Sequence, residues 1–178
     1  AKLQMSQGDL DRALETAQRA VSLNPDIART KTVLGFSQLL QVRTKQAKAE
    51  FLQAIALDQA DPMPRLGMGL ALIREGEIEA GRVELEIAAS LDPANSLIRS
   101  YLGKAYFEEK RYPLAGTQFD LAKEKDPQDP TPWFYDAIQK QTQNRPVEAL
   151  MDLQKSIELN HNRAVYRSKF LLDQDEAA

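Results

Sequence analysis

The sequence predicts an all-α fold, a right-handed superhelical solenoid of antiparallel helix pairs. Three observations lead to this prediction. The nine prolines fall at matching places of a 34-residue period, small residues recur at fixed places of it, and successive periods follow without insertion. A place in the period is called a slot here, with slot 1 at residues 28, 62, 96 and 130, and residues that share a slot form a column.

Prolines mark the expected ends of the helices. A proline inside a helix loses a backbone hydrogen bond and clashes with the preceding turn, at a cost of about 3 kcal/mol, but it is tolerated in a first turn. Slot 32 holds Pro25, Pro93 and Pro127. The other prolines stand in slots 1, 3, 17 and 18, namely Pro62, Pro130, Pro64, Pro132, Pro146 and Pro113. Two helices per period are therefore expected, with breaks near slots 15 and 32.

The period also predicts the domain organisation. We expect one solenoid domain over residues 1–178. Its four complete repeats are 28–61, 62–95, 96–129 and 130–163. Residues 1–27 supply the later part of an earlier repeat, and residues 164–178 begin a further repeat or cap the stack. Both ends are expected to expose apolar side chains. Those expected at the C-terminal end include Phe170, Leu171 and Leu172.

Small residues predict close packing between helices. On the second helix of a repeat, slots 20 and 27 are small and slot 24 between them is usually large, and all three lie on one helical face. In repeat order these slots read Ala13, Ala17, Ala20; Ala47, Phe51, Ala54; Gly81, Leu85, Ala88; Ala115, Phe119, Ala122; Ala149, Leu153, Ser156. Slot 8 of the first helix is small throughout: Ala1, Gly35, Gly69, Gly103 and Ala137. Gly8 and Gly76 stand in slot 15, where a left-handed turn is expected.

These columns resemble the tetratricopeptide repeat, a 34-residue helix–turn–helix unit with small residues in slots 8 and 20, a bulky residue in slot 24, Ala in slot 27 and Pro in slot 32. Trp133, Tyr106 and Tyr112 match the aromatic preferences of that family. The resemblance covers essentially the whole chain. It implies a stack in which neighbouring helix pairs stabilise one another, with the first helices lining a concave wall.

Composition argues against several classes of partner. The formal net charge is −3 and the pI is about 5.3, so we expect no binding to nucleic acid. Cysteine is absent, which leaves no disulfide and no thiolate metal site. The longest apolar run, Leu66 to Ile73, is too short to cross a bilayer, so no direct membrane insertion is expected. Residues 144–168 are similar to multi-repeat proteins of bacteria, and a soluble protein of the cytoplasm or the cell envelope is expected.

No catalytic constellation is recognisable, so we expect no enzyme, no cofactor and no metal site. Gly67 and Gly69 lack the third glycine of a dinucleotide fingerprint, and Gly103-Lys104 lacks the earlier glycine of a phosphate-binding loop. The single histidine, His161, stands in the helix-ending slot 32 and is expected to be structural or solvent-exposed.

The resemblance implies that slots 2, 5, 9, 12 and 13 of the first helices face a ligand. These slots are unusually apolar in this chain, and an exposed apolar surface normally marks an interaction site. The residues expected to bind a peptide are Phe36, Leu40, Leu66, Leu70, Ile73, Arg74, Lys104, Phe107, Phe134 and Ile138. Lys104 is the group best placed to meet an acidic group of the ligand. In the alternative interpretation, successive first helices pack tightly and hide slots 9 and 12.

The preferred hypothesis is a non-catalytic scaffold whose concave groove binds an extended or helical segment of a partner protein. One alternative is a structural spacer or a self-assembly module that associates through its incomplete terminal repeats. Another is a substrate-docking arm of an enzyme whose catalytic domain lies outside this chain. Two specialised functions of the family are disfavoured, because slot 6 supplies neither a basic clamp for a terminal carboxylate nor a ladder of asparagines. That column reads Val33, Gly67, Tyr101 and Tyr135.

Overall fold

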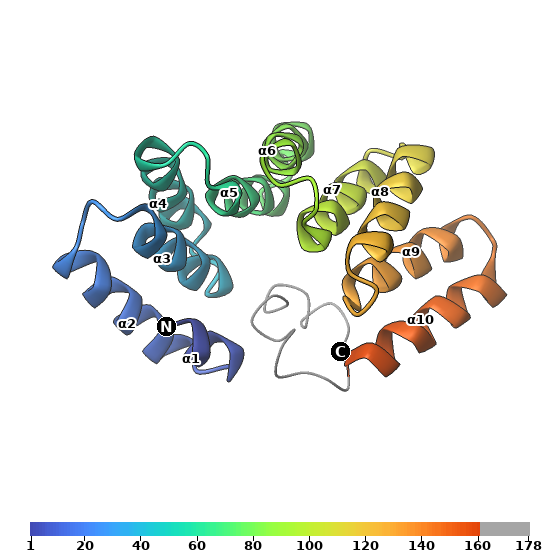
Figure 1. Ribbon diagram of the computed structural model, residues 1–178, viewed down its shortest axis with the longest axis horizontal. Coiled ribbons are helices and arrows are strands. Elements are labelled where there is room, and N and C mark those ends of the chain that lie inside the picture. The colour runs from blue at the N-terminus through green and yellow to red at the C-terminus, as the bar shows by residue number, and fades with distance from the viewer. Residues whose placement is uncertain (161–178) are drawn as a thin grey trace. The chain divides into compact units, whose positions relative to one another are not determined.

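The computed structural model of the chain describes residues 1–160 (Figure 1). These residues form α-helices and no strands, so the predicted all-α class is confirmed for them. The helices are α1 (Lys2–Ser6), α2 (Leu10–Leu23), α3 (Ala28–Leu40), α4 (Thr44–Leu57), α5 (Pro62–Arg74), α6 (Ile78–Leu91), α7 (Ser96–Glu108), α8 (Tyr112–Lys125), α9 (Thr131–Thr142) and α10 (Pro146–Asn160). From α3 onward, first helices end at slot 13 and second helices begin at slot 17. The breaks predicted from the prolines are therefore confirmed.

The described chain divides into two compact units. The N-terminal unit, Ala1–Leu91, contains α1 to α6, and the C-terminal unit, which begins at Asp92, contains α7 to α10. Within the N-terminal unit α3 packs on α4 and α5 on α6, and both α3 and α4 contact α5 (Figure 1). Within the C-terminal unit α7 packs on α8 and α9 on α10, and both α7 and α8 contact α9. The expected nearest-neighbour packing of helix pairs is thus present inside each unit.

A single stack over residues 1–178 remains a prediction. The expected partial or capping repeat at 164–178, with Phe170, Leu171 and Leu172, lies outside the described residues, as does His161.

Slot 15 adopts the left-handed backbone conformation in every described repeat. Gly8 and Gly76 have φ of 77° and 86°, as expected for glycine at this turn. The same conformation occurs at Val42, Lys110 and Asn144, with φ of 59°, 60° and 58°. The geometry of the helix–helix turn is therefore imposed by the packing of the repeat, since it persists where the residue is unsuited to it.

Side chains at the start of several helices satisfy free backbone amides. The Asp61 carboxylate accepts a hydrogen bond from the Met63 amide at 2.9 Å, directly before the first-turn proline Pro62 of α5. The Asn95 side chain accepts one from the Ile98 amide at 3.2 Å at the start of α7. The Asp61 contact, with proline in the first turn, explains why α5 begins where it does, and the Asn95 contact explains the start of α7.

Phe51 of α4 fills the space between the first helices α3 and α5. Its side chain is fully buried, and its ring lies against Gly35 and Gly67. A Cβ atom at Gly35 would lie 2.6 Å from Phe51 Cε1, and one at Gly67 would lie 2.3 Å from Cζ. Both positions therefore require glycine, and the predicted alternation of small and large residues is the means by which α4 joins two neighbouring repeats.

Phe119 plays the same role in the C-terminal unit. It is fully buried on α8, and a Cβ atom at Gly103 of α7 would lie 2.4 Å from its Cε1 atom. On its other side the ring of Tyr135 from α9 stacks on Phe119, with centroids 6.4 Å apart and an angle of 18° between the planes. The core of this unit is thus more aromatic than that of the N-terminal unit, where a glycine stands in the column of Tyr135.

Candidate functional site

In the N-terminal unit, four of the expected peptide-binding side chains are partly buried on α3 and α5. Phe36 and Leu70 occupy slot 9 of the two first helices and pack against the cluster of Leu39, Ala47, Phe51 and Ala71. Leu40 and Ile73 are also partly buried. Their outer atoms form an apolar surface that rests on the rigid core, which suits a preformed binding face.

Arg74 and Leu66 differ from these four. Arg74 is exposed at the end of α5, and its Nη1 atom donates a hydrogen bond to the Leu39 carbonyl at 2.7 Å, which holds the guanidinium against the end of α3. Leu66, in slot 5, is only 1% exposed and lies in the core. Leu66 is therefore not part of an exposed surface.

The C-terminal unit brings together the other four expected residues on α7 and α9. The Phe107 ring is tilted against Tyr112, with centroids 5.8 Å apart, and Phe134 packs edgewise on Tyr135, with centroids 5.4 Å apart. The Lys104 amino group lies over the Tyr135 ring, 5.2 Å from its centroid. Ile138 is partly buried on the same helix as Phe134. Aromatic neighbours thus fix the orientation of Lys104 and both phenylalanines.

Burial differs between the slots that were expected to face a ligand. Slot 5 is buried at Thr32, Leu66 and Ser100 and partly buried at Phe134. Slot 9, in contrast, is partly buried at every described complete repeat, as Phe36, Leu70, Lys104 and Ile138. Packing between neighbouring helices therefore buries most side chains of slot 5, whereas the side chains of slot 9 keep accessible atoms. In each unit, the first-helix face is defined as the accessible side chains in slots 2, 9, 12 and 13 of its first helices, which are α1, α3 and α5 in the N-terminal unit and α7 and α9 in the C-terminal unit. Phe134, which is in slot 5 but only partly buried, is included in it.

A column of polar contacts joins the two helices in each of the repeats 28–61, 62–95 and 96–129 and was not anticipated from the sequence. Slot 4 of the first helix carries a cation and slot 23 of the second helix accepts from it. Arg65 Nη1 lies 2.7 Å from Glu84 Oε2, and Arg99 Nη1 lies 2.9 Å from Gln118 Oε1. In the first complete repeat Lys31 Nζ lies 4.0 Å from Glu50 and 2.7 Å from Gln53 Oε1. The sequence signal was a cation followed 19 residues later by an acid or amide.

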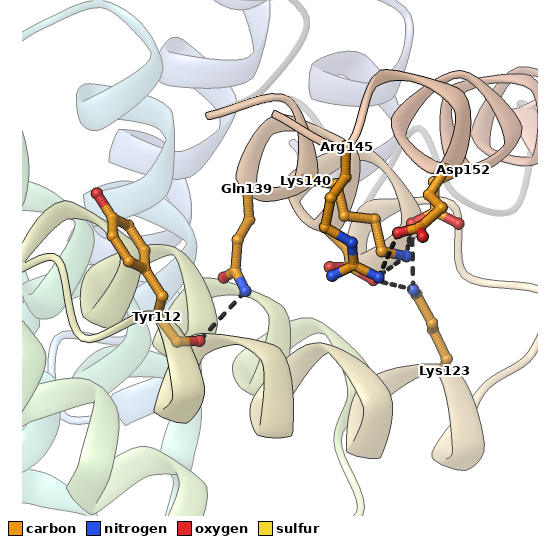
Figure 2. Close-up of polar contacts among 8 residues, drawn as sticks. Tyr112, Lys123, Gln139, Lys140, Arg145 and Asp152 are labelled. Carbon is orange, nitrogen blue, oxygen red and sulfur yellow. Dashed lines mark hydrogen bonds and ion pairs between the residues drawn. The ribbon is translucent and has the colours of Figure 1, made fainter. Parts of the chain in front are cut away.

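The repeat at 130–163 breaks this column, because Trp133 occupies slot 4. Asp152 in slot 23 is met instead by two lysines from other slots, Lys123 of α8 at 3.6 Å and Lys140 of α9 at 2.5 Å (Figure 2). Asp136 pairs with both lysines as well, at 2.9 Å from Lys140 and in close contact with Lys123. The Lys123 amino group also lies 4.4 Å from the centroid of the Trp133 ring.

These four charged side chains, Lys123, Asp136, Lys140 and Asp152, form what we call the ionic cluster. Burial raises the pKa of the Asp136 carboxyl, but hydrogen bonds and attraction from Lys123 and Lys140 outweigh it and leave that pKa below 3.8. Burial likewise lowers the pKa of Lys140, and its contacts with Asp152 and Asp136 raise it overall above 10.5. Asp136 and Lys140 are therefore charged at neutral pH, and each of the four side chains contacts a side chain of opposite charge. The cluster is a structural link between α8, α9 and α10.

A neighbouring polar contact supports the same three helices. The Gln139 side chain of α9 donates a hydrogen bond through Nε2 to the Tyr112 carbonyl at the start of α8, at 3.2 Å (Figure 2).

Several ion pairs in residues 1–160 join different helices, as Arg65 and Glu84 do. Among residues 1–160 no group of three or more His, Cys, Asp or Glu side chains could hold a metal ion. In the same residues no helix has the length and apolar content needed to cross a membrane.

Comparison with known proteins shows which family the repeats define. The sequence model of the tetratricopeptide repeat matches residues 1–62 and 66–130. The chain belongs to the tetratricopeptide repeat family, whose members are generally non-catalytic scaffolds that bind proteins or peptides. No curated protein matches the sequence.

Solved structures of this family share the fold. MamA is 18% identical with a TM-score of 0.68, over 92% of this chain and 95% of that one. YrrB, a tetratricopeptide repeat protein with an unusual peptide-binding site, is 21% identical with a TM-score of 0.61, over 94% and 87%. The Cut9–Hcn1 hetero-tetramer of the APC/C contains a chain that is 17% identical with a TM-score of 0.83, over 89% of this chain and 31% of that one. The predicted family and solenoid class are confirmed.

Proposed function

We propose that the chain is a non-catalytic scaffold that binds peptide segments of partner proteins on the first-helix faces of its units. The observation that carries this proposal is the recurrence of partly buried apolar side chains at slots 9 and 12 on a rigid support. Phe36, Leu70 and Ile73 supply them in the N-terminal unit, and Phe107 and Ile138 in the C-terminal unit. Such a surface loses unfavourable contact with water when a partner covers it.

The aromatic residues of the C-terminal unit suit the role of anchors. Phe107 and Phe134 are held by Tyr112 and Tyr135, so little side-chain entropy is lost when a ligand packs on them. The peptide-binding site named for YrrB shows that the family fold supports such a function in a protein of similar length.

Selection of random 12-residue peptides displayed on phage tests the proposal. Peptides enriched on the wild-type chain should lose at least tenfold in affinity on the variants Phe107→Ala, Phe134→Glu or Ile73→Glu. The matched control is Leu52→Glu on α4, whose side chain is 63% exposed and lies outside the first-helix face. Circular dichroism establishes that each variant keeps its helicity. Enriched peptides that bind all first-helix variants as well as wild type would refute the proposal.

A second candidate, self-association, is favoured by the surface of α10. The residues described leave four large apolar side chains of this helix more than 60% exposed: Val147, Leu150, Met151 and Ile157. An apolar stripe of this kind on a second helix is the surface that a following helix pair would cover. Sedimentation over a range of concentrations should then show association that Leu150→Glu removes and Leu52→Glu does not. A monomer at every concentration would exclude this candidate.

A further inference from the structure

We propose that the first-helix face of the N-terminal unit selects an acidic segment, one that carries apolar side chains together with several carboxylates. This inference rests on the proposed function and adds the chemical class of the ligand. In this unit, charges of opposite sign are separated between the first and the second helices.

The first helices of the N-terminal unit carry charge of one sign. Together α1, α3 and α5 contain Lys2, Arg29, Lys31, Arg65 and Arg74 and not one acidic residue. The unit as a whole is nearly neutral, since residues 1–91 hold 11 basic and 12 acidic side chains. All of these acids therefore stand on the second helices or in the turns. This arrangement gives the first-helix face a positive potential that the net charge conceals.

Two of the five cations are paired with acidic side chains of the second helices. Lys31 and Arg65 occupy slot 4, where they contact Glu50 and Glu84. The other three belong to the first-helix face, with Arg29 in slot 2, Lys2 in slot 9 and Arg74 in slot 13, and all three are exposed. Slots 2, 9 and 13 lie on one side of a helix, because they are separated by seven and four residues.

These three cations are available to a ligand. No ion pair joins Lys2 or Arg29 to another side chain in residues 1–160. Arg74 gives one donor to the Leu39 carbonyl and keeps others, because a guanidinium has five. Exposed, uncompensated arginines are the groups that bind carboxylates with two parallel hydrogen bonds.

The cations flank the apolar side chains already described. Phe36 and Leu40 lie along α3 between its basic start at Arg29 and the end where Arg74 is held, and Leu70 and Ile73 follow on α5. The helices are neighbours: α3 contacts α5, and Ser37 of α3 contacts Met5 of α1 at 3.4 Å. A ligand with apolar side chains in its middle and carboxylates toward its ends satisfies both features at once.

The C-terminal unit offers no such bias. Its first helices mix the two signs, with Arg99, Lys104 and Glu108 on α7 and Asp136 and Lys140 on α9. Lys104, expected from the sequence to meet an acidic group of the ligand, shares its helix with the acidic Glu108. The N-terminal unit is the better site for an acidic segment.

Isothermal titration with three synthetic 12-residue peptides tests the inference. All three carry the same leucines and phenylalanine, and their polar positions are filled by Glu, by Gln or by Lys. The Glu peptide should bind the wild-type chain about tenfold more tightly than the Gln peptide, and the Lys peptide least tightly. Raising NaCl from 50 to 300 mM should weaken the Glu peptide and leave the Gln peptide unchanged.

A double charge reversal locates the effect. Arg29→Glu with Arg74→Glu should cost the Glu peptide at least tenfold and should strengthen the Lys peptide. The matched control is Arg19→Glu with Arg43→Glu, two exposed arginines of the same unit that lie outside the first-helix face, and it should leave the order of affinities unchanged.

The outcomes separate this inference from the proposed function. Equal affinity for the Glu and Gln peptides, abolished by Ile73→Glu, would refute the acidic ligand and leave peptide binding standing. Binding of none of the three peptides would also refute the inference, and the display selection described above then decides independently whether the face binds peptides at all. Equal losses from the two double reversals would place the effect outside the first-helix face and refute the inference as well.

Discussion

At the scale of single residues, the turn between the two helices of a repeat is decided by the backbone. Slot 15 is left-handed whether it holds Gly8, Val42 or Lys110. A left-handed conformation brings Cβ too close to the carbonyl oxygen, and a β-branched residue suffers most. Val42 is also 68% exposed, so burial does not compensate for this strain.

Replacement of Val42 by glycine should therefore raise the free energy of unfolding, by about 1 kcal/mol. Thermal and urea denaturation measure the change. The converse variant, Gly76→Val, is the control, since a Cβ atom at Gly76 would meet nothing within 4 Å and the effect is confined to the backbone. It should destabilise by a similar amount. A Val42→Gly variant less stable than wild type would contradict the argument.

At Gly67 the nearby Phe51 ring, and not the backbone conformation, excludes a side chain. Gly67→Ala should destabilise the chain by about 1–3 kcal/mol, because the new methyl group would overlap the Phe51 ring. The control is Gly116→Ala, where the nearest atom is the movable Nε2 of Gln139 at 3.3 Å, and where the gain in helix propensity offsets the contact. Combination of Gly67→Ala with Phe51→Leu should cost less than the sum of the two single changes. Additive losses in urea denaturation would show that the two residues are not coupled.

At the scale of helices, charge performs two different tasks in the two parts of the chain. In repeats with a cation at slot 4, one pair joins the two helices of the same repeat, as Arg65 and Glu84 do. Where Trp133 displaces that cation, the ionic cluster joins three helices from two repeats. Asp152 of α10 therefore pairs with lysines of α8 and α9. Charged contacts hold α10 against the neighbouring helices, whereas a buried phenylalanine packs α4 and α8 against theirs.

The variant Asp136→Asn should accordingly lower the free energy of unfolding of the C-terminal unit by about 3 kcal/mol at neutral pH, because it leaves two largely buried lysines with one partner. The exposed Asp120→Asn is the matched control and should be neutral. Denaturation by urea provides the measurement.

The pH dependence of the same variant follows from the lowered pKa. A carboxyl whose pKa is lower in the folded chain stabilises it at pH values above the unfolded value of 3.8, and this stabilisation is lost as the pH falls through the folded value. Wild type should therefore lose stability more steeply than Asp136→Asn below about pH 3.8. Parallel curves for the two proteins would show that Asp136 is not held by the cluster.

The sequence revealed the fold through features that steric rules enforce. Proline positions, the glycines at Gly35 and Gly103, and the large residues of slot 24 each follow from exclusion of overlap, and the structure confirms the breaks and packing derived from them. Polar contacts were harder to foresee, since a charged side chain satisfies many arrangements. Asp136 occupies the slot that holds Leu34, Met68 and Leu102 in the other complete repeats, so its lysine partners, which come from α8 and α9, could not be foreseen from the sequence.

The candidate binding residues also include some whose placement could be predicted from the sequence and one whose burial could not. From the resemblance to the family, Phe36 and Leu70 could be placed on the side of their helices expected to face a ligand. The burial of Leu66 could not, because periodicity does not reveal how closely the next helix approaches.

At the scale of the whole molecule, contacts between adjacent helix pairs replace a common core. Each repeat in such a chain is stabilised mainly by contacts with the repeats next to it. A destabilising substitution therefore lowers the stability of its own repeat and the adjacent repeats most. Gly67→Ala should therefore speed hydrogen exchange in α3 to α6 far more than in α8 to α10, as measured by mass spectrometry of peptic peptides. Equal acceleration along residues 1–160 would instead indicate one cooperative unfolding transition.

The chain has a single tryptophan, and that residue is Trp133 beneath the amino group of Lys123. Its intrinsic fluorescence consequently reports on the C-terminal unit and is silent about residues 1–91. An unfolding curve followed by indole emission describes one part of this protein, whereas the amide absorption bands sense every helix. Any difference between the two midpoints thus measures directly how independently the halves melt.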